Sequence, residues 1–309
     1  MTTLVTGGSG FLGLSIVRNL VEDGEKPVVY DLMPNLAPIR GISEKIKVVR
    51  GNILDLPHLM RTIKEHDVDK VIHLVYYGDF ASRKNPYGAV GINLVGTTNV
   101  FEATRILDLE KVVWASSGAV YGPAAYYGGQ SVMIDEEKPT KPDSMYGACK
   151  VMNEFTGQFY CSEYGLDIIA LRLTSVYGAG RYHSVYYTDE IIENPAKGKP
   201  AKVPLSPAEE HDFIYVKDAA RAFLLALRVK KPKHNIFNIG GGTYTLRDIA
   251  DCVKGALPEA VIDFEDRPLM GRVSRFSIER ARRELGFERK YSLKDGVRDM
   301  IQTIKSSSH

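Results

Sequence analysis

The start of the chain constrains the fold most, because an apolar segment runs directly into a cluster of glycines and then into a helical pattern. Residues 3–6 read as a short buried strand, and apolar residues at helical spacing follow over 11–23. Gly7 allows a sharp turn from strand to helix, Gly10 lets the backbone approach a pyrophosphate, and Gly13 lets the helix lie close to the strand. Free N–H groups at the helix N-terminus then face the phosphates. The sequence therefore predicts a turn that binds a dinucleotide.

Asp31 supports this interpretation and indicates which dinucleotide is bound. It ends the second apolar segment, 18 residues after Gly13. A carboxylate there accepts hydrogen bonds from the adenosine ribose hydroxyls and repels a 2′-phosphate. The sequence therefore favours NAD over NADP, while an aspartate in a loop beside a helix, with no ligand, is the alternative.

Strand-like and helix-like segments alternate along most of the chain. The predicted strands are 3–6, 28–31, 46–50, 71–74, 112–116, 168–172 and 236–239, and the predicted helices are 11–23, 55–66, 89–107, 146–165 and 217–229. Short apolar strands that alternate with helices are typical of a parallel sheet covered on both faces. The predicted fold is therefore α/β, a doubly wound, Rossmann-like parallel sheet with a smaller mixed α/β region.

The alternation breaks near residue 175, where a stretch rich in Pro, Gly and Tyr begins, and the last part has mixed helices and one predicted strand. We therefore expect a dinucleotide-binding domain of residues 1–175 and 213–240. A substrate-binding region of residues 176–212 and 241–305 is expected over the carboxyl edge of the sheet, where ligands of open α/β sheets bind.

Composition and charge narrow the partners of the 309-residue chain. The formal net charge is +2 and the basic residues are scattered, which gives no reason to expect nucleic acid or an anionic membrane surface. No apolar run is long enough for a membrane span. Three cysteines without a C-x-x-C pair favour free thiols and a cytoplasmic location, and no cluster has the spacing of metal ligands. The expected partner is a small-molecule substrate.

The catalytic candidates are Ser117, Tyr146 and Lys150. Lowering the pKa of a tyrosine from near 10 to about 7 requires roughly 4 kcal/mol of preferential stabilisation of the phenolate. An ammonium group about 4 Å away supplies about that much at an effective dielectric near 20. Tyr146 and Lys150 are four residues apart and share a helix face. Ser117, at the end of a predicted strand, could then hold a substrate oxygen toward Tyr146 for hydride transfer to a nicotinamide.

Together these motifs resemble the extended short-chain dehydrogenase/reductase superfamily, in its NAD-dependent epimerase/dehydratase branch. The similarity covers nearly the whole chain and rests on the order of the motifs Thr6-Gly7-x-x-Gly10-x-x-Gly13, Asn93-x-x-Gly96-Thr97-x-Asn99, Ser116-Ser117-x-x-Val120-Tyr121-Gly122, Tyr146-Gly147-x-x-Lys150, Leu171-Arg172, Val176-Tyr177-Gly178 and Asp212-Phe213-Ile214-Tyr215-Val216-x-Asp218.

The resemblance implies roles for individual residues. Ser117, Tyr146 and Lys150 would form the catalytic triad. Positions that contact the cofactor would be Gly7, Gly10, Phe11, Leu12, Gly13, Asp31, Asn52, Ile53, Leu74, Val75, Asn93, Tyr146, Lys150 and Thr174. The resemblance also implies a homodimer packed through the helices at 89–107 and 146–165.

Departures from the family pattern concern the substrate. Asn52 stands where an aspartate is usual, and Val75 and Tyr76 replace a small pair, so that bulk lies near the nicotinamide. Gly118 and Ala119 follow Ser117 where sugar dehydratases carry an acid, which argues against elimination. Further contacts of nucleotide-sugar enzymes are altered at Ser175, at His211 and at Leu269-Met270 beside Arg267. The candidate substrate residues are Tyr76, Ser175, His211 and Arg267.

Several alternatives stay open. NADH could be released, as in a dehydrogenase, or the hydride could return to the opposite face, as in an epimerase; a non-catalytic NAD-binding sensor is a third class. A nucleotide-sugar 4-epimerase requires a diphosphate site, which arginines from new positions could rebuild: Arg172, Arg181, Arg267, Arg272 and Arg275. His211 could contact an anion or be structural, and His183 could reach the cleft from its loop. Gly240-Gly241-Gly242 is interpreted as a tight crossover.

Overall fold

The computed structural model describes residues 1–35, 37–181 and 188–306. Its centre is a seven-stranded sheet in the order β10-β6-β5-β4-β1-β2-β3, in which every neighbouring pair is parallel. The strands are β1 (Thr3–Thr6), β2 (Val28–Asp31), β3 (Lys47–Arg50), β4 (Lys70–His73), β5 (Lys111–Ser117), β6 (Ile168–Leu173) and β10 (Ile236–Ile239). All seven predicted strands are present, and the reversal of strand order at β1 confirms a doubly wound sheet.

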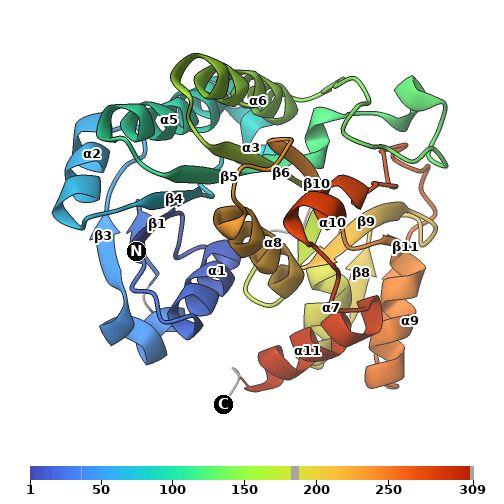
Figure 1. Cartoon of the computed structure of the whole chain (residues 1–309). Helices are drawn as coiled ribbons and strands as arrows, with labels where there is room; N and C mark the ends of the chain where they lie inside the picture. The colour runs from blue at the N-terminus through green and yellow to red at the C-terminus, as the bar shows by residue number, and fades with distance from the viewer. Residues whose placement is uncertain (36, 182–187, 307–309) are drawn as a thin grey trace.

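Helices cover both faces of this sheet (Figure 1). On one face lie α1 (Phe11–Glu22) and α8 (Val216–Arg228), and on the other lie α2 (Leu56–Glu65), α5 (Gly96–Leu107) and α6 (Met145–Tyr164). Two separate apolar clusters fill the layers, one on each side. Strands buried on both faces can be apolar throughout, which explains why the sequence shows short apolar runs instead of alternation.

The predicted helix at 89–107 is not one uniform helix. The short helices α3 (Asp79–Lys84) and α4 (Pro86–Ala89) lead into a π-helical segment, Val90–Val95, which continues as α5. A π-helical turn adds a residue within a helix without breaking it, and such turns are frequent at functional sites. Asn93 lies in this segment and is buried.

The region after residue 175 contains more regular structure than its sequence indicates. Strands β7 (Ser175–Tyr177), β9 (Glu210–Tyr215) and β11 (Thr243–Thr245) form a second sheet in the order β11-β9-β7. A third pair joins β8 (Ala201–Val203) to β12 (Ile262–Phe264). The last part therefore has two strands where one was predicted. The expected domain boundary between residues 212 and 213 falls inside β9.

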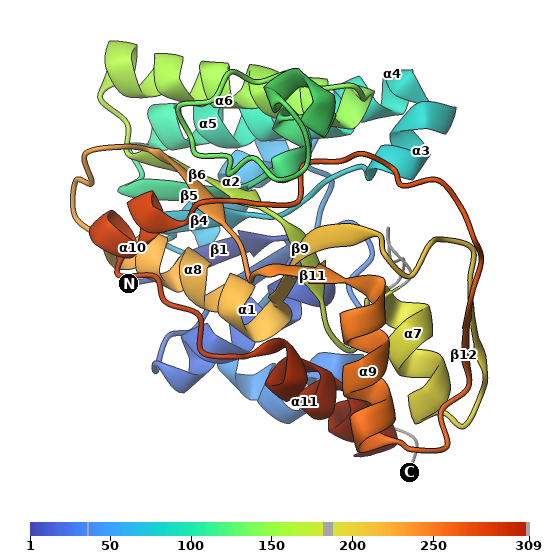
Figure 2. The same ribbon diagram turned by 90° about the vertical axis from the view of Figure 1, so that its right-hand side faces the viewer.

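Helices of this region pack below the second sheet (Figure 2). They are α7 (Thr188–Ala196), α9 (Leu246–Ala256) and α11 (Leu293–Ser306), which contact one another, while α10 (Glu279–Leu285) lies against β10. The apolar cluster beneath α1 and α8 continues without a break into these helices through residues such as Phe213 and Val297. This shared core holds the second region against the large sheet. Among the described residues, no helix is long and apolar enough to cross a membrane.

Candidate active site

The glycine turn between β1 and α1 has the geometry that a dinucleotide pyrophosphate requires. Gly7 has a φ of +71°, a conformation that L side chains rarely adopt. A Cβ added to Gly13 would lie 2.3 Å from the carbonyl oxygen of Gly7, so any side chain there would push the helix away from the strand. Gly10 caps α1, and the N–H groups of the first turn, which includes Phe11 and Leu12, have no partner within the helix. The residues therefore fit a bound diphosphate.

Asp31 lies at the end of β2 and is tied to this turn. Its Oδ2 accepts a hydrogen bond of 2.7 Å from the Ser9 hydroxyl, and Oδ1 faces the backbone N–H of Met33 at 3.3 Å. Ser9 was not among the predicted site residues; its place inside the glycine cluster was the available signal. The carboxylate thus braces the turn and remains at the position where ribose hydroxyls would bind.

We predict that the protein binds NAD more tightly than NADP, because the Asp31 carboxylate would repel a 2′-phosphate. Calorimetric titration with both dinucleotides measures the preference, and Asp31→Asn should weaken it. Asp108→Asn is the matched control, since it removes a carboxylate from an exposed residue with φ of +53°, a conformation that asparagine tolerates. Tighter binding of NADP by the unchanged protein would contradict the assignment.

The other predicted cofactor residues gather at the same edge, although three of their polar side chains, those of Asn52, Asn93 and Thr174, already form hydrogen bonds within the protein. Leu74 and Val75 follow β4, and the Val75 nitrogen would lie 3.3 Å from a Cβ on Gly7. Asn93 uses its side chain to brace this segment: Oδ1 accepts from the backbone N–H of Tyr77 at 2.6 Å, and Nδ2 donates to the Tyr77 carbonyl at 2.9 Å. Ile53, after β3, is buried and packs on Gly96 of α5.

Asn52 precedes Ile53 and is exposed, with its Oδ1 accepting the backbone N–H of Leu54 at 3.0 Å. Thr174 donates a hydrogen bond of 2.8 Å to Asp212. The same Asp212 oxygen accepts the backbone N–H groups of Gly241 and Gly242 at 2.7 and 3.3 Å. These glycine donors therefore serve a buried carboxylate, in agreement with a tight crossover.

The three catalytic candidates come together at the carboxyl end of β5. Ser117 is the last residue of β5, and its Oγ accepts the backbone N–H of Ala119 at 3.1 Å, which leaves its hydroxyl hydrogen for another acceptor. Ser117 hydrogen-bonds Tyr146 in the first turn of α6. Lys150 is buried one turn later, with Nζ 5.5 Å from the centre of the Tyr146 ring and donating to the Ala115 carbonyl at 2.6 Å.

Burial opposes the ionisation of both groups. Desolvation raises the pKa of Tyr146 above its ordinary value, and nearby Tyr76 raises it further, while the Ser117 hydrogen bond and the charge of Arg181 lower it. Desolvation also lowers the pKa of Lys150 to about 8. From the sequence, stabilisation of the phenolate is expected from Lys150, with further positive charge from an oxidised nicotinamide ring. The structure adds Arg181, whose guanidinium carbon lies 5.9 Å from the centre of the Phe11 ring.

The candidate substrate residues differ in how far they are buried and in which groups they contact. Tyr76 stands edge-on to Tyr146 with ring centres 6.1 Å apart and is 56% exposed. Ser175 is partly buried at the start of β7. His211 is buried on β9, and its Nε2 lies 3.1 Å from a carboxylate oxygen of buried Glu209. Arg267 pairs with Glu265 at 2.7 Å on the surface.

The other arginines that could rebuild a diphosphate site are also occupied. Arg172 is buried against Glu154, Arg272 pairs with Asp143 at 2.6 Å, and Arg275 pairs with Glu210 at 3.2 Å. Arg181 donates to the Val176 carbonyl and faces Phe11. His183 lies outside the described residues. Among the residues that the structure describes, no group of three or more His, Cys, Asp or Glu could hold a metal ion.

Comparison with known proteins agrees with this geometry. The sequence profile of the NAD dependent epimerase/dehydratase family matches residues 3–240, which include the glycine turn, Asp31 and all three catalytic candidates. The chain belongs to this family. An epimerase/dehydratase relative from Methanocaldococcus jannaschii, named "Putative UDP-glucose 4-epimerase", is 32% identical over 314 residues and covers 99% of each chain.

Two solved epimerases of this family have the same architecture. The UDP-glucose 4-epimerase of Thermus thermophilus, solved with NAD, has a TM-score of 0.88 at 27% identity and covers 99% of this chain and 100% of its own. The UDP-glucose 4-epimerase of Thermotoga maritima, solved with UDP-glucose, has a TM-score of 0.87 at 26% identity and covers 100% of both. The predicted membership of the extended short-chain dehydrogenase/reductase superfamily and the predicted cofactor, NAD, are confirmed. The chain is an NAD-dependent enzyme, so the interpretation as a non-catalytic sensor is set aside.

Proposed function

We propose that this family member oxidises a secondary alcohol of a polar, sugar-like molecule and that Ser117, Tyr146 and Lys150 carry out the proton chemistry. The observation that supports this most is their convergence at the end of β5, at the same edge of the parallel sheet as the glycine turn. Ser117 holds the substrate oxygen, and Tyr146 accepts the hydroxyl proton. Lys150 stabilises the phenolate. NAD, when bound, accepts the hydride from the carbinol carbon.

Elimination is not part of this proposal. A dehydratase needs an acid near the catalytic serine, whereas Gly118 and Ala119 form a tight turn after Ser117. A Cβ on Gly118 would lie 3.1 Å from the Phe276 ring, so the space beside the serine is filled by an apolar side chain. This arrangement favours oxidation or epimerisation.

The anchoring group of the substrate is proposed to differ from a nucleoside diphosphate. Most of the basic residues considered for a diphosphate site face a carboxylate: His211 faces Glu209, Arg267 faces Glu265, and the corresponding partners of Arg272 and Arg275 are Asp143 and Glu210. Arg181 instead donates to the Val176 carbonyl. Binding a diphosphate would require breaking these pairs or adding anionic charge beside them. A neutral polyhydroxylated substrate avoids that electrostatic cost.

We predict that UDP and GDP give little thermal stabilisation. A ligand at about 100 times its dissociation constant should stabilise the fold by about 2.7 kcal/mol, which a melting scan detects readily. NAD serves as the positive control in the same scan. A saturable shift with either nucleotide, lost in Arg267→Ala or Arg272→Ala, would overturn this prediction and support a nucleotide-sugar substrate.

A nucleotide-sugar 4-epimerase is the second candidate, favoured by the 32% identical relative and by the epimerase solved with UDP-glucose. In that case the hydride returns to the opposite face of a transient ketone, and NADH stays bound. Incubation with UDP-glucose and NAD, followed by NMR of the sugar, would detect the 4-epimer. A dehydrogenase acting on another sugar would instead release a ketone and give NADH absorbance.

We also propose a homodimer that packs through the outer faces of α5 and α6. Large apolar side chains are exposed along these helices and the adjoining π-helical segment, namely Val95, Ile106, Met145, Met152, Phe155, Phe159 and Tyr164. Light scattering after size exclusion should give twice the mass of the chain, and Phe155→Glu together with Phe159→Glu should give the monomer. Val261→Glu, beside β12 in the second region, is the control for an exposed apolar residue elsewhere. A wild-type monomer would contradict the proposal.

A cytoplasmic location is proposed on the basis of the cysteines. Cys149, Cys161 and Cys252 are free thiols in the structure, as expected where disulfides are kept reduced. Cell fractionation tests this, and recovery of the protein with membranes or outside the cell would count against it.

A further inference from the structure

Three successive turns of α6 are fastened to the last three residues of β5. Tyr146 hydrogen-bonds Ser117, and Lys150 Nζ donates to the Ala115 carbonyl at 2.6 Å. One turn later, Glu154 Oε1 accepts a 2.6 Å hydrogen bond from the Ser116 hydroxyl. Residues four apart on a helix lie on one face, so these contacts form a single stripe between α6 and β5. Of these three contacts, only the one between Glu154 and Ser116 involves no residue of the proposed chemistry.

Arg172 fixes the Glu154 carboxylate from the other side. Its Nε and Nη2 donate to the two carboxylate oxygens at 2.9 and 2.7 Å, and both side chains are 5% exposed. Arg172 lies on β6 directly opposite Ser116 in the strand register. Its Nη1 donates to the Tyr121 hydroxyl at 2.5 Å, and that hydroxyl donates to Asn238 at 2.9 Å. The carboxylate therefore joins the helix to both strands.

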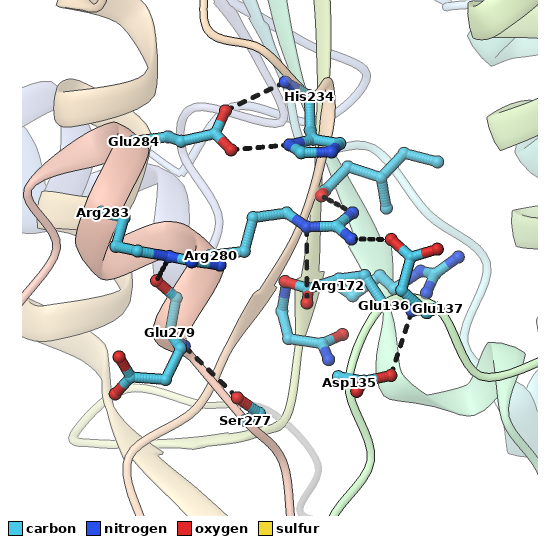
Figure 3. A network of polar contacts seen from close by, with 12 residues as sticks. Asp135, Glu136, Glu137, Arg172, His234, Ser277, Glu279, Arg280, Arg283 and Glu284 are labelled. Carbon is cyan, nitrogen blue, oxygen red and sulfur yellow. Dashed lines mark hydrogen bonds and ion pairs between the residues drawn. The ribbon is translucent and has the colours of Figure 1, made fainter.

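The surroundings give this ion pair no evident ligand. A surface cavity of about 370 Å³ lies beside it, and the charged groups that line the cavity are paired. Arg280 contacts Glu137 and lies 3.7 Å from Glu136, and His234 pairs with Glu284 at 2.6 Å (Figure 3). A buried ion pair adds little net stability, because loss of hydration offsets its Coulomb energy. Stability alone therefore does not explain why the Glu154–Arg172 ion pair is placed against β5.

We propose that Glu154 is a positioning residue that acts through Ser116 to hold the end of β5 against the face of α6 that carries Tyr146 and Lys150. The inference rests on the proposed function of these two residues. Glu154 is also one of the groups that favour the charged form of Lys150, which counters the effect of burial on the Lys150 pKa. The carboxylate thus supports both the place and the charge of the amine.

Ser116→Ala tests the proposal without leaving Arg172 unpaired, because the variant keeps the Glu154–Arg172 pair and removes only its link to β5. The control is Tyr121→Phe, which breaks the same network on the far side of Arg172. The probe is the tyrosine ring carbon that bears the hydroxyl, observed by carbon NMR during a pH titration of the NAD-loaded protein. The Tyr146 signal is assigned from its loss in Tyr146→Phe.

In Ser116→Ala we expect the pKa of Tyr146 to rise by about one unit, since both Ser117 and Lys150 would be held less closely. Turnover, where a substrate is available, should fall about tenfold with the Michaelis constant unchanged. Tyr121→Phe should lower the melting temperature without moving either value. An unchanged Tyr146 titration in Ser116→Ala, or an equal rise in Tyr121→Phe, would overturn the proposal. A shifted titration in a protein that turns over no alcohol would instead refute the proposed function alone.

Discussion

Replacing Tyr146 with phenylalanine is expected to lower turnover by about a thousandfold or more while NAD affinity stays nearly unchanged. The lost hydroxyl accepts the substrate proton, whereas the ring and its packing against Tyr76 remain. Steady-state kinetics at saturating substrate and calorimetry with NAD provide the two measurements. Near-normal turnover in the phenylalanine variant would remove Tyr146 from the mechanism.

Lys150→Met provides the complementary test, because it should reduce both turnover and NAD affinity. In the proposed mechanism this lysine would also bind the nicotinamide ribose, and in the structure its amine lies beneath the Tyr146 ring. Lys111→Met is a control for the loss of a buried lysine, since Lys111 is bound to Asp167 at 3.0 Å at the opposite end of β5. A loss of NAD affinity as large in the Lys111 variant would indicate general destabilisation.

The second large effect is expected on stability at acidic pH, and it comes from His73 at the end of β4. The ring is buried, with Nδ1 2.7 Å from the Thr6 hydroxyl and Nε2 3.1 Å from the Thr97 hydroxyl. Thr97 donates its hydrogen to the Asn93 carbonyl at 2.7 Å, so it accepts from Nε2 and Thr6 donates to Nδ1. These contacts fit a neutral imidazole. Burial, and then the charge of Lys150, lowers the pKa of His73 to about 3.

The unfolded chain takes up a proton at this histidine below about pH 6.5, whereas the folded protein does not until about pH 3. The contribution of His73 to the free energy of unfolding is therefore fully present above pH 6.5. It decreases by roughly 1.4 kcal/mol for each pH unit below that value. Urea unfolding at pH 7 and pH 5 should reveal a loss of about 2 kcal/mol that His73→Gln removes. His66→Gln, at the end of α2, is the control. An equal loss in wild type and His73→Gln would contradict the assignment.

The sequence predicted the large sheet well, and it also pointed to three candidate residues that the fold brings together, because both depend on local patterns. Apolar runs give the strands, and the spacing of Tyr146 and Lys150 on a helix after the β5 strand brings them to Ser117. Strands of three residues, such as β7, β8 and β11, are too short to show a period, so the second sheet escaped prediction. The π-helical segment was also missed, because its apolar spacing is almost the same as that of an α-helix.

Hydrogen bonds between side chains that are far apart in the sequence could not be predicted either. His73 meets Thr6 across 67 residues and Thr97 across 24, and Arg172 meets Tyr121 across 51. The pairing of His211 with Glu209 is local, but Glu209 lies just before the first residue of β9, so the alternation of side chains along the strand does not fix its direction. These polar contacts are fixed by tertiary packing. A single sequence shows the residues that take part but not which of them are partners.

The most direct measurement of the central claim uses a panel of sugars and nucleotide sugars that carry deuterium at the carbinol carbon. The protein is incubated with NAD in ordinary water, and the deuterium is located by mass spectrometry and NMR. Hydride transfer predicts that the label moves to the nicotinamide in a dehydrogenase, or returns to the inverted carbon of the product in an epimerase, and that Tyr146→Phe stops both. Product whose label has exchanged with water, or product formed without NAD, would contradict the account.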